Sequence, residues 1–165
     1  NVTGLTGAVM QMVAHGLTAA VLFLVVGLLY QRTHSRDLAD YGCLLGQAPR
    51  FAFFTAFALL AAIGLPGSAG FIAELHVLVG GYASWGSWIA IVCAGMLIGA
   101  AYGMRVIGRL CMKGLPPAEI ADMTRTEALA AAILGLVIVA LGVWPAPLLN
   151  LVAGSVDRVG RLFGG

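Results

Sequence analysis

The sequence has 165 residues, of which 61% are hydrophobic and only 10% are charged, and its mean hydropathy is +0.99. This composition predicts an integral membrane protein. The formal net charge of +2 is too small to indicate nucleic-acid binding. Cys43, Cys93 and Cys111 lie far apart and lack the spacing of metal ligands, which argues against a zinc site or a disulfide framework.

The apolar stretches are long and continuous, and they do not alternate with the period of two that strands show. Inside a bilayer every backbone amide needs an internal partner, so we expect an all-α protein and not a barrel. About 20 apolar residues cross a bilayer as a helix. On this measure residues 1–165 form one membrane domain with four transmembrane helices, at about 5–30, 51–82, 87–110 and 127–143. The short link through Trp85 and Gly86 predicts an antiparallel hairpin of the second and third segments.

Basic residues mark two of the predicted loops. Following the positive-inside rule, those loops face the cytoplasm or the mitochondrial matrix, and both termini lie on the periplasmic or intermembrane side. Arg158 and Arg161 near the C-terminus weigh against this orientation. The residues that support it are Arg32, Arg36 and Arg50 around the first loop, and Arg105, Arg109, Lys113 and Arg125 around the third.

The motif GLPGSAGFIAE, residues 64–74, predicts that the second helix is broken at Pro66–Gly67. Proline cannot donate its amide and clashes with the preceding turn, while Gly64, Gly67 and Gly70 allow non-helical backbone. Ser68 can cap the groups that the break frees. The alternative is an ordinary proline kink, which neighbouring helices make harmless.

Glu74 makes the break a candidate ion site. A carboxylate within a spanning helix costs several kcal/mol, about 2.5–3.5 on insertion scales, so it is rarely retained without a role or a partner. Glu74 falls about one turn into the second half-helix, near the positive end of that helix's dipole, where an anion is favoured. Alternatively, Glu74 lies near the membrane surface and only anchors the helix.

His15 lies near the middle of the first segment. Its imidazole can accept and release protons near neutral pH, which suits a proton relay, and Gln11 one turn earlier could orient it. The alternative is a neutral histidine hydrogen-bonded between helices. His76 is two residues beyond Glu74 and so lies on a nearly opposite face, which argues against pairing the two.

Three blocks of sequence follow one another: GAVMQMVAHGLTAAVLFLVVGLLYQRTHSRDLADYG, then GLPGSAGFIAE, then GVWPAP. In this order they resemble the C-terminal part of the antiporter-like subunit M family of NADH:quinone oxidoreductase (complex I), whose mitochondrial counterpart is called chain 4. The resemblance covers nearly the whole chain. It implies a fourteen-helix proton-pumping subunit, of which this chain is similar to helices 11 to 14.

The resemblance also implies roles for individual residues. His15 matches the central histidine of helix 11, and Leu65, Pro66 and Gly67 match the element at which helix 12 is broken. Glu74 matches the acidic residue of the outer part of the proton path. The implied location is the bacterial or mitochondrial inner membrane, with several crossings. No redox cofactor is implied for this chain, and NADH, FMN, iron–sulfur clusters and quinone belong to other subunits.

The implied partners are other membrane subunits of complex I, surrounding lipids, and a chain or segment that supplies helices 1–10. Protons would pass from a lysine in that part through His15 toward Glu74, driven by quinone reduction elsewhere in the complex. Two alternatives stay open. The chain is a related subunit of a Na⁺/H⁺ antiporter or membrane-bound hydrogenase, or it is a structural membrane module that conducts no protons.

Overall fold

Helices make up the regular structure of this protein. The computed structural model describes residues 1–112 and 119–162, and within those ranges it contains helices and no strands. The predicted all-α class is confirmed. The longer helices are α1 (Val2–Thr33), α3 (Pro49–Ala62), α4 (Ala69–Trp85), α5 (Ala90–Ile107), α6 (Arg125–Val143) and α7 (Ala146–Leu162). The shorter turns are η1 (Leu38–Asp40), α2 (Leu44–Gln47), η2 (Gly86–Ile89) and the π-helical turn η3 (Gly108–Met112).

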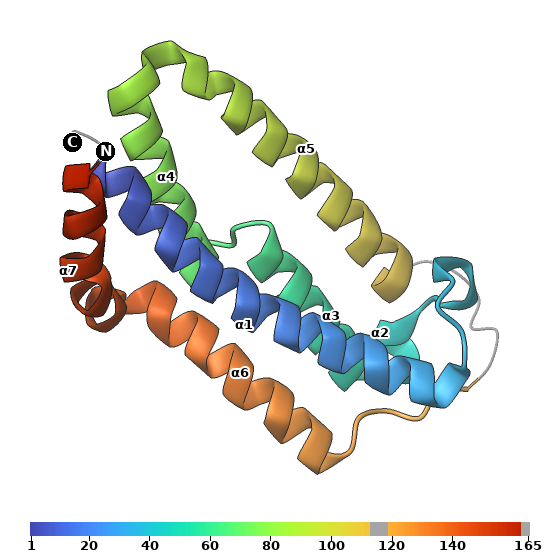
Figure 1. The fold of residues 1–165 in the computed structure, drawn as a ribbon. Helices are drawn as coiled ribbons and strands as arrows, with labels where there is room; N and C mark the ends of the chain where they lie inside the picture. The colour runs from blue at the N-terminus through green and yellow to red at the C-terminus, as the bar shows by residue number, and fades with distance from the viewer. Residues whose placement is uncertain (113–118, 163–165) are drawn as a thin grey trace.

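Within the described residues, three helical stretches are long and apolar enough to cross a membrane: Val2–Thr33, Ala69–Met112 and Arg125–Val143. The first and third contain the predicted segments 5–30 and 127–143. The second is 44 residues long, and Figure 1 shows the chain reversing direction between α4 and α5. Gly86, at this reversal, has a φ of 57°, which glycine adopts without steric cost.

The centre of the bundle is α1, which packs most closely against α4 and also contacts α3, α6 and α7 (Figure 1). A Cβ on Gly7 would lie 2.7 Å from the backbone nitrogen of Val77, and a Cβ on Gly80 would lie 2.6 Å from the Cα of Gly4. Small residues let membrane helices approach this closely. The order of these contacts makes α1 and α4 an antiparallel pair.

A salt bridge joins the end of α1 to the start of α6. Arg32 Nη2 donates to Glu127 Oε2 at 2.7 Å, and its guanidinium lies 5.0 Å from the centre of the Phe51 ring. Thr124 and Glu127 form a capping box in which each side chain accepts from the other residue's backbone N–H. Thr124 is therefore the N-cap of α6.

Asp122 ties the loop before α6 to the first turn of α3. Its carboxylate accepts from the backbone N–H groups of Arg50 and Phe51 at 3.3 and 3.2 Å, and Arg50 Nη1 donates to the Met123 carbonyl at 2.8 Å. Arg32, Arg50 and Arg125 thus gather at one end of the bundle. Lys113, which supported the predicted orientation, lies outside the described residues.

The helix α7 was not predicted, because its residues lack a long apolar run. Pro147 stands at its second position, where a proline is compatible with a starting helix, and Leu149 N donates to the Pro145 carbonyl at 3.0 Å. One side of α7 packs on the start of α1, since a Cβ on Gly160 would lie 2.9 Å from Val2 Cγ2. The proline-rich motif therefore connects two helices.

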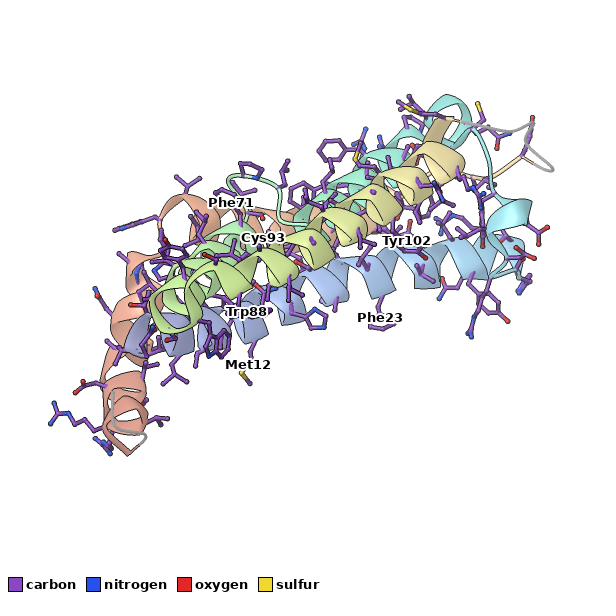
Figure 2. The ribbon with its side chains drawn as sticks, turned by 90° about the horizontal axis from the view of Figure 1, so that it is seen from above. Met12, Phe23, Phe71, Trp88, Cys93 and Tyr102 are labelled. Carbon is purple, nitrogen blue, oxygen red and sulfur yellow. The ribbon has the colours of Figure 1, made fainter. Side chains whose placement is uncertain are left out.

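Large apolar side chains cover much of the outer surface of the bundle. Figure 2 shows Met12 and Phe23 projecting from α1 away from the other helices, and they are 74% and 77% exposed. Trp88 and Tyr102 on the η2–α5 arm are exposed to a similar extent. Apolar surface of this size marks a face that meets lipid or another chain.

Candidate functional site

The broken helix begins with a glycine-based stop at the end of α3. Gly64 has a φ of 79°, its N–H donates to the Ala61 carbonyl at 3.4 Å, and the N–H of Leu65 donates to the Leu60 carbonyl at 2.9 Å. This pair of bonds is the Schellman motif, which satisfies the last carbonyls of a helix through a left-handed residue. Gly64 therefore ends α3 in a defined conformation.

A tight turn and a cap then start α4. The N–H of Ser68 donates to the Leu65 carbonyl at 2.9 Å, with Pro66 and Gly67 between them and a φ of 93° at Gly67. Proline followed by a glycine with positive φ is typical of a type II turn. Ser68 Oγ accepts from the N–H of Phe71 at 3.4 Å and is the N-cap of α4. The backbone between Ala62 and Ala69 is therefore ordered by its own hydrogen bonds.

Gly70 lies outside this break. It is the second residue of α4, and a Cβ on it would lie 3.3 Å from the Ala61 carbonyl oxygen. The prediction that Gly70 belongs to the non-helical segment is corrected accordingly. Its small size instead allows the start of α4 to pack closely on the end of α3.

Two other helices pack directly on the break. A Cβ on Gly142 of α6 would lie 2.6 Å from the carbonyl carbon of Gly67 and would overlap the Gly67 oxygen. A Cβ on Gly103 of α5 would lie 2.7 Å from Ile63 Cγ2. The break is therefore packed closely on the backbone side by α6 and at the Ile63 side chain by α5. Sequence reasoning did not single out Gly142, although it opens the GVWPAP block.

The Glu74 carboxyl group reaches back from α4 to the stop glycine. A Cβ on Gly64 would lie 3.1 Å from Glu74 Cδ and 3.3 Å from Oε1, and it would overlap Oε2. Glu74 is partly buried, and among the described residues its carboxyl group has no hydrogen bond or ion pair. The break thus presents one ionisable group without a fixed partner.

His15 lines a cavity of about 80 Å³ between α1 and the two half-helices. Gln11 and Thr18 line it from α1, and Gly70 from α4. The buried Oε1 of Gln11 has no hydrogen-bond partner among the described residues, and no hydrogen bond joins Gln11 to His15 there. Gln11, His15 and Thr18 supply the polar side chains of a lining that is otherwise apolar. The cavity has room for water beside them, because one water needs only about 10–15 Å³ of such space.

The cavity and Glu74 lie one helical turn apart along α4. Gly70 lines the cavity, and Glu74 is four residues further, so both lie on the same side of the helix. Among the described residues no hydrogen bond or ion pair joins His15 to Glu74, and Glu74 does not line the cavity. The polar groups on this face of α1 recur at positions 11, 15 and 18, a helical spacing that made Thr18 detectable from the sequence.

His76 belongs to a different region. Its Nδ1 lies 2.8 Å from the Ile72 carbonyl oxygen, and its side chain lines a cavity of about 450 Å³ with residues of α1 and α7, among them Thr6 and Asp157. Within the described ranges no group of three or more His, Cys, Asp or Glu residues is placed to hold a metal ion.

These features define a class: helical membrane proteins with a discontinuous helix and an ionisable group beside its break. A family model described as NADH:quinone oxidoreductase/Mrp antiporter, TM, matches residues 1–100. The chain belongs to this family.

Several relatives carry names from complex I. The chain is 35% identical over 160 residues to NADH-quinone oxidoreductase subunit M of Rickettsia typhi, covering 95% of this chain and 32% of that protein. It is 36% identical to subunit M of Rhodobacter capsulatus (96% and 32% covered) and 32% identical to NADH-ubiquinone oxidoreductase chain 4 of Marchantia polymorpha (96% and 33%). The predicted resemblance is confirmed, and the chain spans about a third of the length of these relatives.

The fold has a counterpart among solved structures. The chain matches a chain of respiratory complex I from Thermus thermophilus with bound NADH, with a TM-score of 0.86 and 26% identity. The match covers 99% of this chain and 36% of that one. The fold of this chain is therefore that of about a third of a chain of respiratory complex I.

Proposed function

We propose that this chain is the C-terminal part, helices 11 to 14, of a proton-translocating subunit of respiratory complex I. It contributes the broken helix and the outer half of a proton path that is coupled to quinone reduction. The observation that carries this proposal is the Glu74 carboxyl group, which lies at the helix break without a fixed partner among the described residues. The family match and the complex I relatives support it.

In this mechanism His15 accepts a proton from the part of the subunit that supplies helices 1–10. The proton crosses the cavity on water that Gln11 and Thr18 help to hold, and it reaches Glu74 one turn along α4. Glu74 releases it to the outer side. A carboxyl group with no permanent ion pair suits this role, because its charge is not already neutralised by a neighbouring arginine or lysine.

The rest of the reaction belongs to partner subunits. NADH oxidation and quinone reduction take place on FMN, iron–sulfur clusters and quinone outside this chain. The chain crosses the inner membrane four times, with α3 and α4 forming one interrupted crossing and α5 the next, and with both termini on the periplasmic or intermembrane side. The Val2–Thr33 and Arg125–Val143 helices supply the other two crossings.

Mass spectrometry of the protein and everything that co-purifies with it in mild detergent tests this assignment. We expect the redox and membrane subunits of complex I, together with a chain or segment that carries helices 1–10. The family description also includes Mrp antiporters, which favours a second candidate, a subunit of a multi-subunit Na⁺/H⁺ antiporter. If antiporter or hydrogenase subunits co-purified and redox subunits of complex I did not, the second candidate would replace our proposal.

Comparing Gly64→Ala with Gly67→Ala distinguishes two effects. One is the displacement of the Glu74 carboxyl group, and the other is the cost of placing alanine at a positive φ. Both glycines have positive φ, so alanine at either position should cost about 1–2 kcal/mol of stability. Only a methyl group on Gly64 would meet Glu74, because a Cβ on Gly67 has no atom within 4 Å.

We therefore expect similar losses of thermal stability in the two variants, but reduced proton translocation only in Gly64→Ala. Thermal unfolding in detergent and proton uptake in vesicles measure the two effects. Equal proton translocation by both variants would show that the position of the Glu74 carboxyl group does not matter for transport.

A further inference from the structure

An apolar groove runs between α3 and α6 on the surface of the bundle, with a volume of about 280 Å³. Phe53 and Phe57 line it from α3, and their rings stack with centres 6.4 Å apart. Ala132, Leu136 and Val139 line it from α6, and its lining is almost entirely apolar. Phe53 and Leu136 are 62% and 69% exposed, so the groove opens on the outer surface of the described bundle.

Two arginines stand at one end of this groove, on the faces that line it. Arg50 precedes Phe53 by three residues and Phe57 by seven, and Arg125 precedes Ala132 by seven. Residues at these spacings share one face of a helix. The Arg50 guanidinium donates to the Met123 carbonyl at 2.8 Å, which holds it beside the start of α6. Two exposed arginines therefore lie at the same end of the groove.

Two acidic groups that flank this end of the groove, Glu127 and Asp122, are already engaged. Glu127 forms its salt bridge with Arg32. The Asp122 carboxylate accepts from backbone N–H groups of Arg50, Phe51 and Met123. Arg125 has no ion pair or hydrogen bond with the described residues. An anion approaching this end would meet Arg125 and the outer side of Arg50.

We propose that the groove binds one anionic phospholipid, with its phosphate at Arg50 and Arg125 and an acyl chain along Phe53, Phe57 and the facing residues of α6. Basic residues next to a groove between membrane helices are a common site for anionic headgroups. The distance fits, because the 14 residues from Arg125 to Val139 rise about 21 Å along α6. Half of a bilayer of about 40–45 Å, headgroups included, has the same depth.

The charge at the end distinguishes a lipid from a partner helix. A transmembrane helix that filled the groove would gain nothing from two arginines at its mouth unless it carried an acid there. A phospholipid supplies a phosphate at that level and hydrocarbon below it.

Lipid retention in the purified membrane complex tests the site. The complex is delipidated, incubated with phosphatidylglycerol or with phosphatidylcholine, and analysed for bound lipid by native mass spectrometry. We expect phosphatidylglycerol to bind the unaltered protein more tightly than phosphatidylcholine does. Arg125→Gln should weaken phosphatidylglycerol binding about fivefold, and the double variant Arg50→Gln, Arg125→Gln about thirtyfold, at roughly 1 kcal/mol for each arginine.

Arg158→Gln, which removes an exposed arginine of α7, is the matched control and should leave binding unchanged. Arg125→Gln removes no hydrogen bond or ion pair with the described residues, so we expect this variant to fold as the unaltered protein does. A photo-crosslinker on Cys in Ala132→Cys should label lipid. Equal binding of the two lipids, unchanged binding in Arg125→Gln, or crosslinking of residue 132 to a partner transmembrane chain would overturn the proposal.

Discussion

Glu74→Gln is expected to lower proton translocation by the assembled complex about tenfold or more, by analogy with the loss of a positioned acid–base group. Glutamine has nearly the same shape and keeps the hydrogen-bonding capacity of the side chain, but it cannot take up and release a proton. Proton uptake into vesicles, measured per NADH oxidised, separates transport from redox chemistry. If Glu74 only anchored α4, glutamine would serve equally well and the ratio would not change.

Two matched controls sharpen this experiment. Glu119→Gln makes the same change at an exposed carboxylate in the loop before α6 and should leave transport unchanged. His15→Asn should reduce transport, whereas His34→Asn should not, because His34 is exposed beyond α1 and asparagine tolerates its φ of 55°. Normal transport in both Glu74→Gln and His15→Asn would remove the proposed pathway.

Much of the helix break could be predicted from the residues themselves. Proline at position 66 and glycines at 64 and 67 predict an interruption, and Ser68 was expected to cap freed groups. The structure adds the particular form, a Schellman stop at Gly64 followed by a Pro–Gly turn. Local sequence encodes such features because each depends on the backbone preferences of one or two residues.

The parts that escaped prediction depend on contacts between distant segments. The proximity of Glu74 to Gly64 follows from the angle at which α4 leaves the turn, and the cavity around His15 follows from how α1 crosses both half-helices. A local sequence motif predicts neither the direction of α4 after the turn nor the way α1 crosses the two half-helices. The helix α7 escaped for another reason: a search for continuous apolar runs does not detect a helix with only one apolar face.

Gly142 shows how two of the sequence blocks depend on each other. It opens the GVWPAP block, and its α carbon faces the backbone of the LPG block at a distance that leaves no room for a side chain. The turn at Gly67 therefore explains why the GVWPAP block has a glycine at position 142. The close backbone of α6 supports the turn from outside, because Gly67 itself has no side chain to pack.

Gly142→Ala is expected to destabilise the protein by about 2 kcal/mol, within the range of about 1–3 kcal/mol for overpacking. The methyl group would press on the Gly67 and Ser68 backbone, which is fixed by hydrogen bonds and cannot move aside as a flexible side chain could. In α5, Gly99→Ala is the matched control, since a Cβ there has no atom within 4 Å. Alanine favours helix over glycine by up to about 1 kcal/mol, so the control should be neutral or stabilising.

Thermal unfolding of the two variants in mild detergent compares them directly. Opposite signs would show that the cost at Gly142 comes from its contact with the break and not from glycine as such. A loss of stability in Gly99→Ala equal to that in Gly142→Ala would mean that α6 does not hold the break through this contact. The turn at Pro66–Gly67 and the helix caps would then have to hold the two half-helices in place by themselves.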